Sequence, residues 1–428
     1  MAQTQAVLNA LRGSDLNRRL GFTLLMLVVF RLGAHIPIPG VRASVIQALF
    51  QNGASVFSLL NLFAGGATAT LSLFALSIIP YINSSIIMQL MTVVIPTLEE
   101  WSKEGEEGQR RINTYTRWGA LILGALQSLG ISYFLYNYSY QGQSVYIHHD
   151  IGSLLLTALL LTTGTIVLMW IGEQISDKGI GNGISLLVFF GIISRLPYGF
   201  NTLSQYLAAG ALSVTKLVIF LLVAVVIVAG VVFVNEGQRK VPVQYPKRVV
   251  GRRMYQGQTT HLPIRVNQAG VIPVIFAISL LVLPYTVANF VRPTWTQWLE
   301  QYFGFTSGVY IALEFLLVVL FTFFYSQVVF KVDDIADNLK KAGGYIPGIR
   351  PGKPTAEYLG RVSNRLTFIG ALFLGVVAIL PNFVTMAMGI PGLYFGGTSL
   401  LIVVGVVLDT VKQMQAHLLM RQYQGFMK

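Results

Sequence analysis

Residues 214 to 234 read VTKLVIFLLVAVVIVAGVVFV, an apolar run whose only charged side chain is Lys216, close to its start. Because an α-helix rises about 1.5 Å per residue, about 20 apolar residues are enough to cross the hydrocarbon core of a bilayer. A globular core rarely contains uncharged stretches of this length. The run therefore predicts a membrane-spanning helix.

Nine further apolar runs extend this interpretation to the whole chain. Of the 428 residues, 54% are hydrophobic and only 11% are charged, whereas soluble domains carry about 25% charge. We therefore expect an all-α membrane protein with ten transmembrane helices. The other nine spans are expected near 20–36, 71–95, 117–136, 153–172, 183–197, 268–290, 309–330, 366–387 and 396–411.

The first of these runs raises the question of a cleaved signal peptide. It ends in Ala34-His35-Ile36-Pro37, which lacks a small-x-small cleavage pattern before the next polar segment. We expect a retained first span, with a cleaved signal peptide as the alternative.

The distribution of Lys and Arg supports the assignment of spans. All but five of the 30 basic residues fall in loops or termini on the same side as the N-terminus. The opposite loops carry only Arg42 and Arg292, and the remaining three lie in spans or at their ends. By the positive-inside rule, both termini are expected in the cytoplasm of a multi-pass inner-membrane protein.

Ten spans divide into two sets of five. Because five is odd, the second set would enter the membrane in the opposite orientation, which predicts two inverted halves. We expect an N-terminal half over 1–205 and a C-terminal half over 206–428, joined through 196–213. Cytoplasmic loops of the second half are expected near 235–267 and 331–365, where Pro and Gly favour protruding hairpins.

The stretch between Ala43 and Leu98 contains no charged residue, yet its apolar part is about twice the length that one helix needs. Gly65-Gly66 interrupts it. We expect a short re-entrant half-helix at 56–66 and a turn before the second full span. Irregular backbone at membrane depth is tolerated only inside protein or beside a watery cavity. An amphipathic segment on the outer surface is the alternative.

Prolines and aliphatic residues mark spans 2 and 7. Pro80 is expected to interrupt span 2, and Pro273 and Pro284 bracket span 7, at corresponding places in the two halves. Ile78, Ile82 and Ile86 share one face of span 2. Ordinary proline tolerance and a plain lipid or helix contact are the alternatives.

Several kinds of site are excluded or disfavoured. Cysteine is absent, and ionisable residues at membrane depth are few, unlike in ion-coupled transporters. Gly348-Ile349-Arg350-Pro351-Gly352-Lys353 has the wrong spacing for a phosphate loop, and 179–183 joins two spans as an interhelical turn. His148-His149-Asp150 has no second ligand cluster. We expect no catalytic residue, metal or cofactor.

The loops 235–267 and 331–365 each carry seven basic residues. Topology and attraction to anionic membrane lipids are one explanation. Docking of an anionic partner, such as ribosomal RNA or an acidic protein surface, is the other.

Motifs in a fixed order along nearly the whole chain resemble those of the SecY family, the channel subunit of the bacterial protein-conducting channel. They are Arg31-Leu32-Gly33 through Pro37-Ile38-Pro39-Gly40, Asn61 through Gly66, Pro80-Tyr81-Ile82, Gly172 through Ile175, Gly179 through Ser185, Thr260 through Pro263, Ala269 through Pro273, Ala336 through Lys341, Pro347 through Gly352 and Tyr394 through Ser399.

The resemblance implies an hourglass channel with a plug, an aliphatic pore ring at its waist and a lateral gate between spans 2 and 7. The resemblance implies that the half-helix is a plug near 56–70, with plug residues Asn61, Phe63, Gly65 and Gly66. The implied ring comprises Ile78, Ile82, Ile184, Val188, Ile275 and Ile402. Implied gate residues are Pro80, Asn83, Gln89, Asn267 and Pro273. A narrow apolar waist of this kind would exclude water and ions yet yield around a passing chain.

The resemblance also implies partners and a function. The SecA motor ATPase and the ribosome would dock on Arg239, Lys240, Lys247, Arg248, Arg252, Arg253 and Arg350, while SecE and SecG subunits would accompany the channel. Unfolded polypeptides would cross through the channel, and signal peptides and apolar segments would leave it sideways into lipid. Two alternative functions remain open. One is a secondary transporter of small solutes, and the other is a basic membrane scaffold for ribosomes that has no pore.

Overall fold

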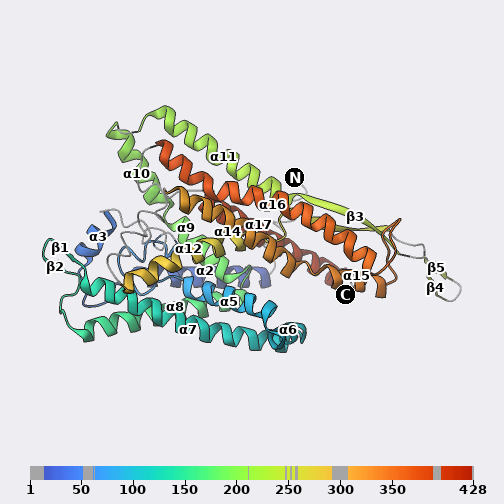
Figure 1. The fold of residues 1–428 in the computed structure, drawn as a ribbon, viewed down its shortest axis with the longest axis horizontal. Helices are drawn as coiled ribbons and strands as arrows, with labels where there is room; N and C mark the ends of the chain where they lie inside the picture. Colours follow the sequence, from blue (N-terminus) through green and yellow to red (C-terminus); the bar gives the residue numbers. More distant parts are fainter. Residues whose placement is uncertain are drawn as a thin grey trace.

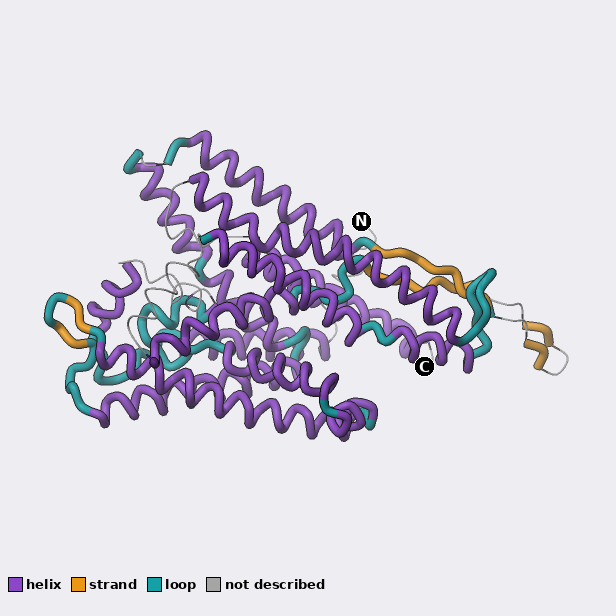
Figure 2. Tube along the Cα trace, in the orientation of Figure 1, coloured by secondary structure: helices purple, strands orange, loops and turns teal. Residues whose placement is uncertain are grey.

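The computed structural model describes residues 14–51, 61, 63–210, 212–245, 248–250, 253–255, 259–291, 307–388 and 397–426. Long helices run side by side through most of the molecule, and short strands lie at its two ends (Figures 1 and 2). The helices of the N-terminal part are α2 (Ser14–Gly33), α3 (Ala43–Gln51), α5 (Ile79–Val94), α6 (Pro96–Lys103), α7 (Glu106–Asn137), α8 (Ile151–Lys178), α9 (Gly183–Ser194) and α10 (Leu196–Ala208). Those of the C-terminal part are α11 (Val214–Glu236), α12 (Ile272–Val291), α14 (Gly308–Val329), α15 (Val332–Lys341), α16 (Lys353–Met388) and α17 (Gly397–Phe426).

The fold class predicted from the sequence, a bundle of membrane-spanning helices, is confirmed. In the described part of the chain, seven helices are long and apolar enough to cross a membrane, or eight if α5 and α6 form one span bent by 100°. The helices α2 and α12 occupy the places of the first and seventh expected spans. α11 is the most apolar of the seven, and most of its surface is exposed to the surroundings.

Span 2 begins later than expected. The sequence predicts helix from residue 71, but α5 begins at Ile79 and residues 64–78 form turns. Pro80 therefore does not interrupt a helix, contrary to the expectation from the sequence. It lies in the first turn of α5, and Pro273 holds the same place in α12. The first turn tolerates proline because its N–H groups have no partner within the helix.

The segment expected to join the halves is also largely helical. α10 continues from α9 after Arg195, and the two together make one of the candidate spans, Gly183–Ala208. The short fifth span of the sequence analysis is thus longer than predicted. Pro197 lies in the first turn of α10, where proline does not break a helix.

Helix contacts repeat in the two parts of the chain. In the N-terminal part, α7 packs on both α5 and α8, and α8 also contacts α9 and α2. The C-terminal part repeats this order, because α14 packs on α12 and α16, while α16 contacts α17 and α11. The two sets meet where α12 contacts α5 and α7, and again where α17 contacts α9.

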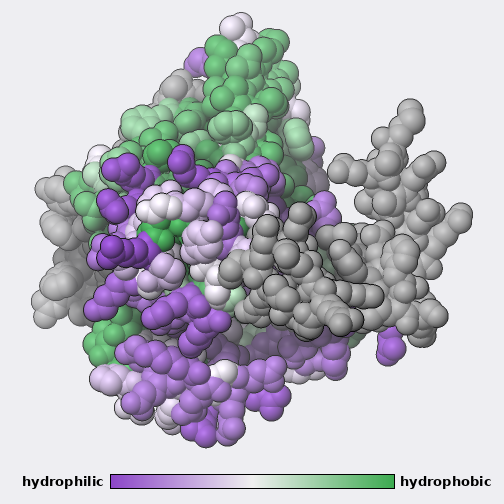
Figure 3. All heavy atoms as spheres, turned by 90° about the vertical axis from the view of Figure 1, so that its right-hand side faces the viewer, coloured by the Kyte–Doolittle hydropathy of each residue, from purple (hydrophilic) through white to green (hydrophobic). Residues whose placement is uncertain are grey.

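One end of the molecule, here called the polar end, carries α6, α15 and an antiparallel pair of β3 (Gln238–Gln244) with β6 (Thr259–Arg265). β4 (Arg248–Val250) and β5 (Arg253–Tyr255) pair beyond it. The loop 235–267 is thus a hairpin, as predicted, whereas 331–365 consists of α15, a turn and the start of α16. Hydrophilic residues gather on this end, and hydrophobic residues cover the flank beside it (Figure 3).

The opposite end contains a short helix and a two-stranded hairpin that the sequence analysis missed. α3 contacts β1 (Ser139–Tyr140), which pairs with β2 (Gln143–Ser144). Isolated bridges join Val41 to Tyr146 and Pro37 to Ser72. These short elements connect the loop after α2 to the hairpin between α7 and α8.

Candidate functional site

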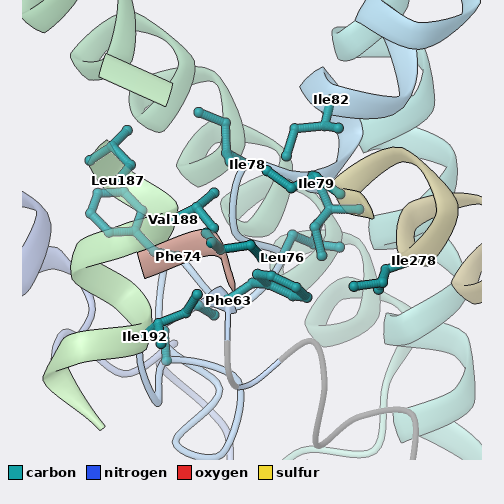
Figure 4. Close-up of a cluster of buried hydrophobic side chains, with 14 of the residues drawn as sticks. Phe63, Phe74, Leu76, Ile78, Ile79, Ile82, Leu187, Val188, Ile192 and Ile278 are labelled. Carbon is teal, nitrogen blue, oxygen red and sulfur yellow. The ribbon is translucent and has the colours of Figure 1, made fainter. Parts of the chain in front are cut away.

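The six residues of the predicted pore ring lie in one contiguous hydrophobic cluster. Their side chains come from the start and first turn of α5 and from α9, α12 and α17. All are buried except Ile184, which is partly buried and packs against the cluster. In Figure 4, Ile78 lies between Val188 of α9 and Ile82, and Ile278 of α12 is drawn on the far side of Ile79. Side chains from both parts of the chain thus meet in one apolar region.

A turn-rich stretch comprising residues 61 and 63–78 contributes side chains to this cluster and is here called the re-entrant segment. Phe63, Phe74 and Leu76 lie in the same close-up as the ring residues Ile78, Ile82 and Val188 (Figure 4). Residues 64–70 form turns. Of the expected half-helix at 56–66, residues 56–60 and 62 lie outside the described part of the chain.

The re-entrant segment holds its own shape through hydrogen bonds. Asn61 is buried; its carbonyl accepts from Gly66 N at 2.9 Å, and its Oδ1 accepts from Ala69 N at 3.0 Å. Ser77 Oγ donates to Phe63 O at 3.1 Å, and Thr68 Oγ1 donates to Ala75 O at 2.7 Å. Buried backbone groups need such partners. The segment between α3 and α5 therefore has a defined structure that internal hydrogen bonds stabilise.

Four of the five predicted gate residues lie on α5 and α12, two helices that are in contact. Asn83 of α5 is only 2% exposed, and within the described residues neither of its amide atoms has a hydrogen-bond partner. Gln89 Nε2 lies 3.4 Å from Ser85 Oγ, while its Oε1 has no partner there. In the described part of the chain, the predicted gate side of α5 therefore contains amide atoms of Asn83 and Gln89 that are buried and have no hydrogen-bond partner.

Asn267, which is also a predicted gate residue, precedes α12 and contacts the end of α11. Its Nδ2 donates to Asn235 Oδ1 at the end of α11 (2.8 Å) and to Gly270 O (3.0 Å). It does not bond to the polar residues of α5. The place of Asn267 is the junction between β6 and α12.

A buried polar cluster that the sequence analysis missed lies beside this junction. Gln268 Oε1 accepts from Ser326 Oγ of α14 at 3.1 Å, and Gln268 Nε2 lies 3.4 Å from Ser363 Oγ of α16. Ser326 Oγ is also 2.8 Å from Thr367 Oγ1 of α16. These partners are 41 to 95 residues apart in sequence, so no local pattern could have revealed them.

The predicted docking residues that the structure describes lie at the polar end. Arg239 and Lys240 are exposed on β3, and Arg350 is exposed in the turn before α16, where its carbonyl accepts from Thr355 Oγ1 at 2.8 Å. Arg248 lies on β4 and Arg253 on β5, while Lys247 and Arg252 lie outside the described residues.

The two basic loops share a small hydrophobic core, here called the polar-end core. Its buried members are Val241, Val243, Ile264, Ile346 and Leu359, contributed by β3, β6, the turn after α15 and α16. The residues predicted to dock partners are thus carried by one packed unit.

The motifs set aside in the sequence analysis have structural roles. α8 ends at Lys178 and α9 begins at Gly183, so 179–183 is an interhelical turn, as predicted, in which Asn182 Oδ1 caps α9 by accepting from Ile184 N and Ser185 N. Asp150 caps α8. Among the described residues, no group of three His, Cys, Asp or Glu side chains could hold a metal ion.

Known proteins resemble this chain in sequence and fold. The SecY family matches residues 72–411. The protein translocase subunit SecY of Halalkalibacterium halodurans is 47% identical over 434 residues, which cover 99% of this chain and 100% of that protein. A solved protein-conducting channel, 18% identical, aligns with a TM-score of 0.66 over 95% of this chain and 93% of that one. A second, 17% identical, aligns at 0.64 over the same shares; its plug domain is described as stabilising the closed channel and maintaining a membrane seal.

Proposed function

Because the chain belongs to the SecY family of protein translocase subunits, we propose that it passes unfolded polypeptide through the apolar cluster between its two helical halves. It is a protein-conducting channel subunit and not an enzyme. The observation that supports the proposed path is that Ile78, Ile82, Ile184, Val188, Ile275 and Ile402, from both parts of the chain, belong to one hydrophobic cluster that also contains residues of the re-entrant segment. A narrow apolar constriction loses water and so blocks ions, but it binds a passing chain only weakly.

The lateral gate is proposed between α5 and α7 on one side and α12 on the other. These helices come from different halves, 1–205 and 206–428, and they are in contact. Separating them would open a path from the pore to lipid. An apolar residue gains several tenths of a kcal/mol in the bilayer, whereas a charged one loses about 3 kcal/mol. Partitioning of a segment between the pore and the lipid can therefore select signal peptides and membrane segments.

The energy for transport is proposed to come from partners at the polar end. The exposed basic residues Arg239, Lys240 and Arg350 lie on one packed unit with the polar-end core beneath it. A basic surface of this kind attracts nucleic acid or acidic protein. The SecA motor and the ribosome are the proposed partners there, with SecE and SecG as companion subunits.

The proposed location is the bacterial inner membrane with both termini in the cytoplasm. The end of α17 lies at the same end of the molecule as α6, α15 and β3 (Figure 1). The loops that carry most of the basic residues lie there too, and such loops stay on the cytoplasmic side. The polar end would then face the cytoplasm.

Cross-linking of an arrested polypeptide tests the proposed path. Photoreactive residues would replace each of the six ring residues in turn, and Leu222 and Val225 of α11, which are 61% and 68% exposed, serve as lipid-facing controls. We expect adducts with the arrested chain at ring positions and none at the controls. Equal labelling at both sets would refute the path, and solute uptake driven by an ion gradient without partners would instead support a secondary transporter.

A further inference from the structure

Arg31 lies in the last turn of α2 and reaches the re-entrant segment. Its Nη1 donates to the carbonyl of Gly65 at 2.9 Å, across 34 residues of sequence. In the part of the chain that the structure describes, Arg31 makes no ion pair with a carboxylate. This guanidinium is therefore directed at a peptide carbonyl of a turn.

Among the described residues, Arg31 is the stronger of two hydrogen-bond donors near the Gly65 carbonyl. Ser194 Oγ of α9 lies 3.5 Å from the same oxygen, but its single proton is donated to Gly191 O at 2.8 Å. A hydrogen bond with a charged donor is roughly twice as strong as a neutral one. Arg31 is thus the main polar tie between Gly65 and the helices around it.

Close backbone packing places Gly65 where Arg31 can reach it. A Cβ on Gly65 would lie 2.9 Å from Ser194 Oγ and 3.2 Å from Gly191 Cα, and a Cβ on Gly191 would lie 2.6 Å from Phe63 O. Gly65 also has a φ of +64°, which favours glycine. The re-entrant segment therefore packs closely against the backbone of α9 and accepts a hydrogen bond from Arg31 of α2.

A charge at the C-terminal end of a helix also interacts favourably with the helix dipole. That explanation would be satisfied by a side chain extended toward solvent or lipid headgroups. The observed side chain turns toward Gly65 instead, so the dipole alone does not account for its position.

We propose that Arg31 is the positioning residue that keeps the re-entrant segment seated in the closed channel. The proposal rests on the proposed function, because it takes this segment to be the channel's plug. Opening would then require the Arg31–Gly65 bond to break and Gly65 to leave Gly191, which links displacement of the plug to movement of α2 against α9.

A labelling experiment tests the position of the segment without relying on transport. The chain contains no cysteine, and Ala64 is 0% exposed, so Ala64→Cys gives a single buried thiol next to Gly65. In proteoliposomes, a water-soluble maleimide should modify this thiol about tenfold faster in Arg31→Gln than in the parent, as expected for loss of a charge-assisted hydrogen bond. Arg31→Lys should give an intermediate rate.

Arg42→Gln is the matched control, because Arg42 Nη1 also donates to a carbonyl, Ser144 O at 3.3 Å, but outside the re-entrant segment. It should leave the labelling rate unchanged. Gly191→Ala, which crowds Phe63 O, should raise the rate independently of Arg31. Unchanged labelling in Arg31→Gln, or an equal rise in Arg42→Gln, overturns the proposal.

Ion conductance of idle channels gives the second readout and should rise in Arg31→Gln. The two hypotheses fail differently. If the parent protein passes no polypeptide with a motor present, the proposed function is wrong. If the parent transports polypeptide but Arg31→Gln has the same labelling rate and ion conductance as the parent, the proposed function stands and the positioning role of Arg31 is refuted.

Discussion

Gln244 and Tyr345 join the two basic loops through backbone and side chain at once. Gln244 N donates to Tyr345 O at 2.8 Å, Tyr345 N donates to Gln244 O at 2.9 Å, and the Tyr345 hydroxyl donates to Gln244 Oε1 at 3.0 Å. Tyr245 also lies against Gly344. The hairpin after α11 and the turn after α15 are therefore parts of one unit, although 101 residues separate the paired positions.

Truncation of the polar-end core should loosen both loops together. Ile264 is 0% exposed on β6, and Ile264→Ala should destabilise this unit by about 2–5 kcal/mol. Hydrogen exchange should then accelerate in α15 as well as in β3 and β6, while Tyr345→Phe, which removes one hydroxyl, should have a small effect. Faster exchange confined to the hairpin would contradict the single-unit interpretation.

A charge in the predicted pore ring should disturb the seal. Ile82 is 6% exposed among aliphatic side chains, and Ile82→Arg would place there a charge that requires water. We expect a higher ion conductance in planar bilayers and altered transport of a secretory protein. Ile82→Leu, which keeps an aliphatic surface, should behave like the parent. Unchanged conductance and transport in Ile82→Arg would count against the ring.

The sequence predicts the spans well because their signal is local. Runs such as 214–234 and 309–330 coincide closely with α11 and α14, since hydropathy alone determines which segments can enter a bilayer. Span 2 is less well predicted. The apolar run begins before the helix, because buried turns of the re-entrant segment are as apolar as the helix that follows them.

Residues of the candidate site differ in how far the sequence can identify them. Helical spacing places Ile78, Ile82 and Ile86 on one face, and all three are buried, but only the resemblance to a known family implies that the first two belong to a ring. Arg31 is visible in the sequence as a charge within a span. Its bond to Gly65 depends on tertiary packing, so no local pattern predicts it.

Removal of the unsatisfied amide of Asn83 should favour the closed gate. A buried polar group without a partner costs about 1–3 kcal/mol, and opening would expose Asn83 to water or to a peptide. Asn83→Leu, of similar size, should therefore stabilise the closed state and raise the hydrophobicity that a signal peptide needs for export. Asn201→Leu, at an exposed position of α10, is the control. Easier export of weak signal peptides by Asn83→Leu would contradict this prediction.

Gln268 should couple displacements of the polar-end unit to α12, a helix of the proposed lateral gate. It lies between β6 and α12, and its amide contacts Ser326 of α14 and Ser363 of α16. A Cβ on Gly370 of α16 would lie 2.6 Å from Val266 O, so the backbone before α12 also packs directly on α16. Because α16 begins within the polar-end unit and continues into the bundle, a displacement of that unit reaches the start of α12 through these contacts.

Gln268→Leu keeps the size of the side chain but loses both contacts, each worth about 0.5–1.5 kcal/mol if it is an ordinary hydrogen bond. We expect motor binding to the polar end to be unchanged, because no docking residue is altered, while polypeptide transport falls severalfold. Binding assays and transport in proteoliposomes measure the two separately. Gln205→Leu on the exposed side of α10 should change neither. Parallel losses of binding and transport in Gln268→Leu would show that the residue stabilises the docking unit itself and does not transmit its movement to the gate.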